Sequence, residues 1–196
     1  MQIELQGKIV ELAGETSAVT KSVMDAVAAN GGAVEMGAAT VADILIVSFP
    51  LLPLAPYDPS VLLETAKITG EAMAARGSGR IVFLVSAAAG MPMRRHPEFS
   101  VAMAGVMATV RTLAMRLGPH VLVNAVGVGA VAVGAVGEAL VAGDAAMLGH
   151  ASVKRPGTIA EITDTVLFFC DPLNTYATGQ MLSVDGGWSA GYGRSF

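Results

Sequence analysis

Ser86 is the polar residue of this chain that is best placed for chemistry. It follows the apolar run Ile81 to Val85, which is typical of a buried strand, and a helical pattern begins near Glu98 and continues to Leu117. In open α/β sheets, catalysis and ligand binding take place where polar residues leave the carboxyl end of a strand and a helix follows. A lone serine at a strand end is more often a plain hydrogen-bonding residue, so chemistry here requires further polar groups.

Few other side chains could supply such groups. His96 and Glu98 lie in the loop before the helix, where either could act as a general acid or base, although a solvated charge is the commoner role. The three histidines are scattered and show no metal-ligand spacing, so we expect no metal. The single cysteine, Cys170, ends an apolar helical pattern and reads as a small buried hydrophobe. One cysteine cannot form an internal disulfide, which favours a reducing cytoplasmic location.

The elements that would position these residues alternate between strands and helices. Strands are expected at residues 7–14, 33–36, 42–50, 81–85, 121–126 and 180–185. Helices are expected at residues 19–28, 60–76, 98–117, 136–148 and 159–170. This alternation predicts an α/β fold with a Rossmann-like, doubly wound parallel sheet of about six strands. We expect one domain over residues 1–196.

Composition narrows the classes of protein to which the chain can belong. Hydrophobic residues make up 53% and charged residues 14%, with a mean hydropathy of +0.60. A parallel sheet buried on both faces, a large oligomer interface or a membrane segment could each explain this. The most apolar run, residues 121–136, is short for a membrane span and contains Asn124 and several glycines, and no N-terminal signal is visible. A net charge of −4 without a basic cluster argues against nucleic-acid binding.

Three stretches of sequence carry a family resemblance. They are GRIVFLVSAAAG (residues 79–90), GPHVLVNAVGVGAV (118–131) and RPGTIAEITDTVLFFCDPLNTYATGQMLSVDGG (155–187). In this order they resemble the short-chain dehydrogenase/reductase (SDR) family. The resemblance implies a Rossmann fold and, in active members, oxidation or reduction with NAD or NADP.

The resemblance also implies that the catalytic residues have been lost. The family uses a serine, a tyrosine thirteen residues later as general acid/base, and a lysine four residues beyond the tyrosine. Ser86 stands at the serine position, but Phe99 and Met103 stand at the tyrosine and lysine positions. Phenylalanine has no proton to give and methionine carries no charge, so we expect Ser86 to be vestigial and the chain to have no catalytic residue.

The cofactor motif is degenerate as well. Of the glycines in the family's phosphate-binding turn, Gly14 is retained, while Ala18 and Thr20 replace the other two and Glu15 adds a negative charge. The stretch from Gly14 to Pro50 is about half as long as in the family. The second helix, third strand and third helix are therefore expected to be missing. We expect no cofactor in this chain.

An apolar outer face on the helix of residues 98–117 suggests a partner. Val101, Ala104, Ala108 and Met115 lie opposite the face that should pack on the sheet. Family members usually form tetramers through this helix and its neighbour, and through the last helix and strand. The resemblance therefore implies a non-catalytic subunit that pairs with an active SDR paralogue in an α2β2 heterotetramer, with NAD or NADP bound by the partner.

Two other hypotheses stay open at this point. The chain could be a homo-oligomeric binding or sensor protein, with Phe49, Phe99 and Met103 lining an apolar cleft. It could also be an active enzyme that uses His96 or Glu98 in place of the tyrosine.

Overall fold

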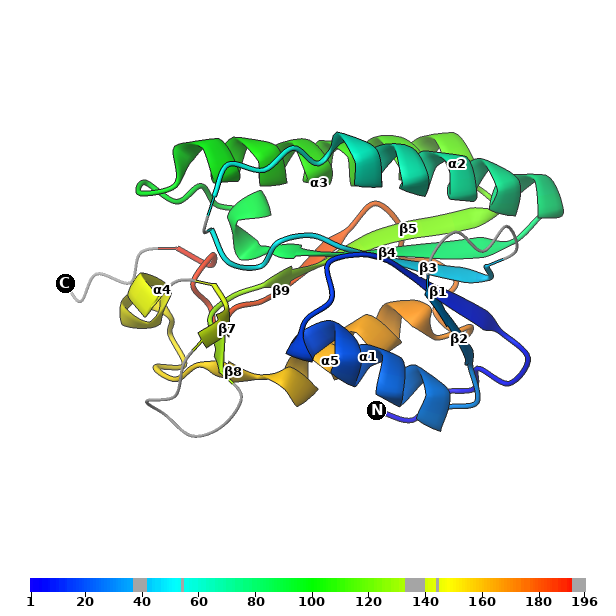
Figure 1. Cartoon of the computed structure of the whole chain (residues 1–196), viewed down its shortest axis with the longest axis horizontal. Helices are drawn as coiled ribbons and strands as arrows, with labels where there is room; N and C mark the ends of the chain where they lie inside the picture. Colours follow the sequence, from blue (N-terminus) through cyan, green and yellow to red (C-terminus); the bar gives the residue numbers. More distant parts are fainter. Residues whose placement is uncertain (37–41, 54, 133–139, 144, 192–196) are drawn as a thin grey trace.

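The computed structural model describes residues 1–36, 42–53, 55–132, 140–143 and 145–191, and its centre is a parallel sheet. Six strands lie in the order β2-β1-β3-β4-β5-β9, which confirms the predicted doubly wound sheet (Figure 1). Their bounds are β1 (Ile9–Gly14), β2 (Ala33–Met36), β3 (Ile44–Ser48), β4 (Gly79–Ser86), β5 (Val121–Val128) and β9 (Met181–Val184).

Helices cover both faces of this sheet. On one face lie α1 (Ala18–Ala29) and α5 (Ile159–Cys170), and on the other lie α2 (Ser60–Arg76) and α3 (Pro97–Leu117) (Figure 1). Leu45 and Phe83 point to the α2/α3 layer, whereas Ile44 and Val82 point to the α1/α5 layer. Because both of their faces are buried, the central strands β3, β4 and β5 read as largely continuous apolar runs rather than alternating ones.

The short stretch between Gly14 and Pro50 changes the edge of the sheet. β1 lies between β2 and β3, and the chain passes from β2 to β3 with no helix or strand among the described residues between them. β2 pairs with β1 only, so within the described sheet it is an edge strand. These observations agree with the expected loss of one strand and two helices.

A small second sheet corrects one sequence prediction. It has the order β7-β6-β8 and consists of β6 (Val131–Ala132), β7 (Leu140–Ala142) and β8 (Gly157–Thr158). We predicted a helix over residues 136–148, but residues 133–139 lie outside the described part and 140–142 form a strand. The helix α4 starts only at Ala145 and ends at His150. β7 forms because β6 is available as an antiparallel partner, which a local pattern does not reveal.

Candidate functional site

Ser86 ends β4 at the carboxyl edge of the sheet, as predicted, and it is fully buried. Its Oγ accepts a hydrogen bond from the Ala88 amide at 3.3 Å and so caps the short 3₁₀ helix η1 (Ala87–Ala89). The hydroxyl therefore has a local structural task at the start of the loop that leads to α3.

Phe99 and Met103 lie one turn apart on the face of α3 that packs on the sheet. Their side chains are 3% and 0% exposed and belong to the core cluster between the sheet and the α2/α3 layer. At the positions where the SDR resemblance implies a tyrosine and a lysine, this chain thus has two apolar side chains packed in the core. Neither side chain can transfer a proton or hold a charge.

His96 and Glu98 lie at the beginning of α3. His96 precedes the helix, and its carbonyl oxygen accepts a hydrogen bond from Ser100 Oγ at 2.8 Å. Glu98 is exposed in the first turn, where a negative charge favours the helix dipole. A helix-terminal role accounts for Glu98 without catalysis.

Gly14 is retained for a reason that involves the sheet. It pairs with Ser48 in register and has a φ of +99°, and a Cβ at this position would collide with the Ser48 carbonyl oxygen. The same carbonyl accepts a hydrogen bond from the Glu15 amide at 3.0 Å. Only glycine fits at this position, with or without a bound phosphate.

The N-terminus of α1 is closed by its own side chains. Ser17 Oγ accepts a hydrogen bond from the Thr20 amide at 3.2 Å, and Thr20 Oγ1 accepts one from the Ser17 amide at 2.7 Å. Thr20, which stands at a glycine position of the family motif, is therefore part of a capping box and is buried. Ala18 is exposed at the first position of the helix. Two amide groups that a phosphate could use already have partners.

The loop after β3 fills the space beside this turn. The Phe49 ring stacks on Phe83 with centroids 5.8 Å apart, and Tyr57 meets its edge at 6.3 Å. The cavity that is left has a volume of about 240 Å³, and Glu15 and Ser48 contribute to its lining. This volume lies below the range of about 300–1,000 Å³ that is usual for sites of drug-sized ligands.

Tyr57 is a residue of this remnant that the sequence analysis missed. Burial raises the pKa of its phenol, and the nearby charges of Glu15 and Asp58 raise it further. The phenol is consequently a poor base at neutral pH. Its position in a proline-rich loop gave no sequence signal that it would lie beside the carboxyl ends of β1 and β3.

Residues 177–180, part of the stretch that resembles the SDR family, form hydrogen bonds that hold the start of β9 against β5. Asn124 Nδ2 donates to the Ala177 carbonyl oxygen at 2.8 Å, and Asn124 Oδ1 accepts from the Gln180 amide at 3.1 Å. Thr178 Oγ1 accepts from the Val123 amide at 3.0 Å, while the Gly179 amide donates to the Val123 carbonyl oxygen at 2.7 Å. These contacts explain the motif through structure alone.

The VDGG turn after β9 is held in the same way. Asp185 accepts hydrogen bonds from the Gly187 amide at 2.9 Å and from the Ser189 amide at 3.0 Å. Gly129, which directly follows β5, lies so close to the Asp185 backbone that a Cβ would not fit. The turn carries Trp188, a second residue that sequence reasoning did not single out.

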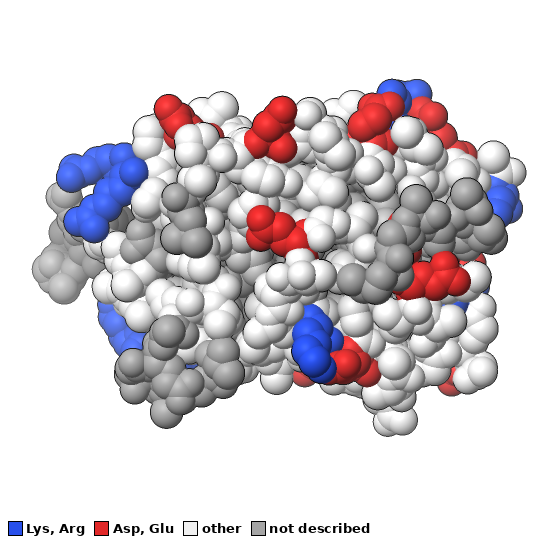
Figure 2. Space-filling model, viewed as in Figure 1, with Lys and Arg blue, Asp and Glu red and all other residues white. Residues whose placement is uncertain are grey.

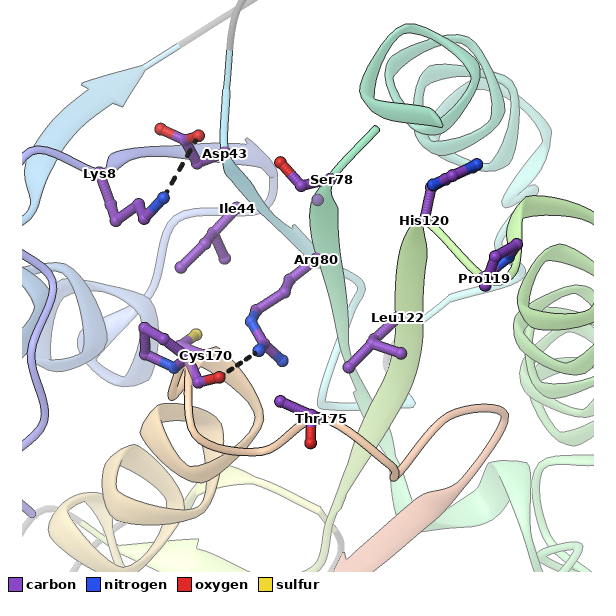
Figure 3. Close-up of a pocket in the computed structure, with 12 residues that line it drawn as sticks. Lys8, Asp43, Ile44, Ser78, Arg80, Pro119, His120, Leu122, Cys170 and Thr175 are labelled. Carbon is purple, nitrogen blue, oxygen red and sulfur yellow. Dashed lines mark hydrogen bonds and ion pairs between the residues drawn. The ribbon is translucent and has the colours of Figure 1, made fainter. Parts of the chain in front are cut away.

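A cavity at the opposite, amino-terminal edge of the sheet, which has charged side chains on its walls, also has a structural explanation. It measures about 280 Å³, and Figure 3 shows Arg80 and the Lys8–Asp43 pair on its walls. Arg80 donates to the Asn174 and Pro172 carbonyl oxygens at 2.7 and 3.1 Å, and burial lowers the pKa of its guanidinium. Arg80 therefore secures the turn that follows α5.

The outer face of the α2/α3 layer exposes large apolar side chains among charged ones, which include the Glu71–Arg116 ion pair. Val101 and Met115 of α3 are 74% and 79% exposed, and Val61 and Ile68 of α2 are 75% and 59% exposed. Ala104 and Ala108 lie between the two α3 residues and are exposed as well. The four residues predicted as an interface, Val101, Ala104, Ala108 and Met115, thus lie on one accessible face of α3. Among the described residues, no helix is long and apolar enough to cross a membrane.

The described residues offer no metal site, because no group of three or more His, Cys, Asp or Glu side chains among them comes together. Charged side chains are sparse on the face that Figure 2 shows, and both signs are interspersed. Neither observation points to a metal centre or to an extended basic surface.

Comparisons with known proteins agree with the fold. A family model described as enoyl-(acyl carrier protein) reductase matches residues 60–189. The short-chain reductase protein NovJ of Streptomyces niveus is 37% identical over 126 residues, which cover 60% of this chain and 48% of NovJ. A 3-oxoacyl-(acyl-carrier-protein) reductase of Synechocystis is 35% identical over 123 residues, covering 62% of this chain and 49% of that protein. The chain thus spans about half the length of the curated relatives it matches.

Solved structures show the same architecture. A short-chain type dehydrogenase/reductase from Mycobacterium ulcerans superposes with a TM-score of 0.72, at 19% identity, over 97% of this chain and 93% of that one. At this level of identity the likeness concerns the fold.

Proposed function

The chain belongs to the short-chain dehydrogenase/reductase family, and from that premise we propose that it is a non-catalytic subunit of an SDR oxidoreductase. It would pair with an active NAD- or NADP-dependent paralogue, an alcohol dehydrogenase or ketoreductase, in a cytoplasmic α2β2 heterotetramer. In this role it stabilises the partner and helps to shape the partner's substrate site. The arrangement is similar to that of the inactive subunit of (hydroxyphenylmethyl)succinyl-CoA dehydrogenase.

The observation that carries the proposal is the burial of Phe99 and Met103 in the core. Loss of a positioned acid/base group typically costs about 10²- to 10⁴-fold in rate. Here the lysine position is lost too, and the surrounding space is closed by packing rather than kept open for a substrate. The filled cleft beside Gly14 and the carboxylate of Glu15 support the absence of a cofactor from this chain.

A second observation favours a partner. Val61, Ile68, Val101 and Met115 are exposed on the outer face of the α2/α3 layer, and the small residues Ala104 and Ala108 lie between the two residues of α3. Small residues allow another helix to approach closely, and exposed apolar patches mark contact surfaces. The active site has been lost while the surface suited to assembly has been kept.

Native mass spectrometry of the tagged chain, purified from its own host, tests the pairing. We expect a second subunit of SDR size in equal amount, and its identity would name the substrate. A chain that purifies only as a homo-oligomer would contradict the pairing and favour the alternative, a homo-oligomeric binding or sensor protein. For a binding or sensor protein we expected an apolar cleft lined by Phe49, Phe99 and Met103. Phe99 and Met103 are instead buried in the core and do not line an open cleft.

An activity assay tests the absence of catalysis. The purified, folded chain should neither oxidise nor reduce alcohols or ketones with NAD(H) or NADP(H). Turnover that disappears in His96→Ala or Glu98→Ala would instead establish an active enzyme with a replaced acid/base group.

A further inference from the structure

The cavity at the amino-terminal edge of the sheet brings two cationic side chains to one face of the strands. Arg80 of β4 pairs in register with Ile44 of β3, and Lys8 lies two positions before Val10, the register partner of Ile44 in β1. Register partners, and residues two apart along a strand, project from the same face of a sheet. Figure 3 shows Lys8 and Arg80 on either side of Ile44, beside the C-terminal end of α5.

Arg80 carries a half-buried positive charge that forms no ion pair with a carboxylate of the described residues. Its acceptors among these residues are two neutral groups, the carbonyl oxygens of Asn174 and Pro172. An arginine has five N–H groups, so three are left for a ligand or for water. Burial lowers the pKa of the guanidinium, yet arginine stays charged at every accessible pH. An anion in the cavity would supply the counter-charge that the fold does not provide.

Lys8 adds a second cation to the wall. Its Nζ lies 3.9 Å from Asp43 Oδ1, which is close enough for an ion pair but too long for a hydrogen bond. The other oxygen of this carboxylate, Oδ2, accepts a hydrogen bond from the Ile9 amide at 2.9 Å. The hydroxyl groups of Ser78 and Thr175 also line the cavity and can donate. The walls therefore carry a lysine and an arginine against a single carboxylate.

From this arrangement we infer that the cavity binds one small oxyanion, either inorganic phosphate or a short carboxylate. The anion would lie over Ile44, between the guanidinium of Arg80 and the ammonium of Lys8, and the arginine fork can pair with two of its oxygen atoms. The cavity volume of about 280 Å³ lies below the range of about 300–1,000 Å³ that is usual for drug-sized ligands, which suits a small ion.

This site is separate from the positions that the SDR resemblance marks for catalysis and cofactor binding. Ser86 and Gly14 end their strands at the carboxyl edge of the sheet, and neither lines the cavity. Every group that the inference uses belongs to this chain, so it does not depend on the subunit proposal.

Equilibrium dialysis of the folded chain tests the site, with radiolabelled phosphate in one arm and radiolabelled acetate in the other. Sodium chloride keeps the ionic strength constant, because chloride lacks the paired oxygen atoms that match an arginine fork. We expect saturable binding of one anion per chain at millimolar concentrations, and the anion that binds more tightly identifies the kind of ligand. The absence of saturable binding in both arms would overturn the inference.

Substitutions with opposite expected effects then locate the anion. Lys8→Ala should weaken binding about 3- to 10-fold, because a charge-assisted hydrogen bond is lost. Asp43→Asn should strengthen binding about 2- to 5-fold, because it removes a like charge from the wall while its amide oxygen can still accept from the Ile9 amide. Arg80→Gln should abolish saturable binding. Lys21→Ala removes a positive charge from an exposed position on α1 and should change nothing.

Arg80→Gln also loses the hydrogen bonds that hold the turn after α5, so circular dichroism must show that this variant is folded. Lys8→Ala and Asp43→Asn leave those bonds in place and decide the question if it is not. Unchanged affinity in both of these variants, weaker binding in Asp43→Asn, or an equal loss in Lys21→Ala would each overturn the inference. Phosphate bound in a partner subunit would not respond to Lys8→Ala or Asp43→Asn. None of these results would alter the native mass spectrum, so the two proposals fail separately.

Discussion

Met103→Lys is the perturbation that examines the closed site most directly, because it restores the residue type of the family to its own position. Met103 is 0% exposed and lies in the core cluster, so the new ammonium group would lose its hydration. Met115→Lys is the matched control, since it makes the same exchange on the same helix at a side chain that is 79% exposed. Methionine and lysine have similar lengths, which keeps the steric difference small.

The size of the effect follows from the burial. A lysine in an apolar core has a pKa lowered by up to 3–5 units, and each unit corresponds to about 1.4 kcal/mol. We therefore expect Met103→Lys to lower the free energy of unfolding by about 3–5 kcal/mol at neutral pH. For a chain of this length that is a fall in Tm of about 10 °C. Met115→Lys should stay within about 0.5 kcal/mol in the isolated chain.

Urea unfolding followed by circular dichroism measures both variants. Because the folded state of Met103→Lys holds the amine neutral while the unfolded state binds a proton, its stability relative to wild type should rise as the pH increases from 7 to 10. Met115→Lys should show no such rise. A loss below about 1 kcal/mol for Met103→Lys, or equal losses for the two variants, would refute a closed apolar site. Met115→Lys should also weaken co-purification of the proposed partner.

Three further predictions concern the backbone, a helix cap and the thiol. Gly14→Ala should cost at least about 2 kcal/mol more than Gly77→Ala in urea unfolding, because both glycines have positive φ but only the Gly14 Cβ would meet a backbone carbonyl. The hydrogen bond from Arg155 and the cap of α5 lower the pKa of Glu161 to about 2, so its contribution is present above about pH 4.5 and is lost as the pH falls towards 2. Glu161→Gln should therefore destabilise the protein by less than about 1 kcal/mol at pH 7 and by still less at pH 2, where about half of the carboxyl groups are protonated. Burial raises the pKa of Cys170 to about 12, so the thiol should react with a disulfide reagent only after unfolding, and rapid labelling of the folded chain would contradict this.

The sequence alone was sufficient to predict the central sheet and most of its helices. Continuous apolar runs between glycines and prolines marked the strands, and the bounds of β2, α2 and α5 were predicted to the residue. Local pattern determines these elements, because a strand buried on both faces, such as β3, is apolar along most of its length and the left-handed Gly77 ends α2. The short stretch between Gly14 and Pro50 likewise revealed the missing strand.

The tertiary structure decided what surrounds those elements. β7 formed because β6 was in reach, and Phe49 and Tyr57 closed the cleft because Phe83, from another strand, offered a ring to stack on. Trp188 met Met93 and Met147 only through the folding of three distant segments. Residue types and spacing along the chain therefore determined which side chains stand at the three positions that the SDR resemblance marks for catalysis, namely Ser86, Phe99 and Met103. Long-range packing determined the volume of each cavity, because the space between elements depends on contacts that no local pattern contains.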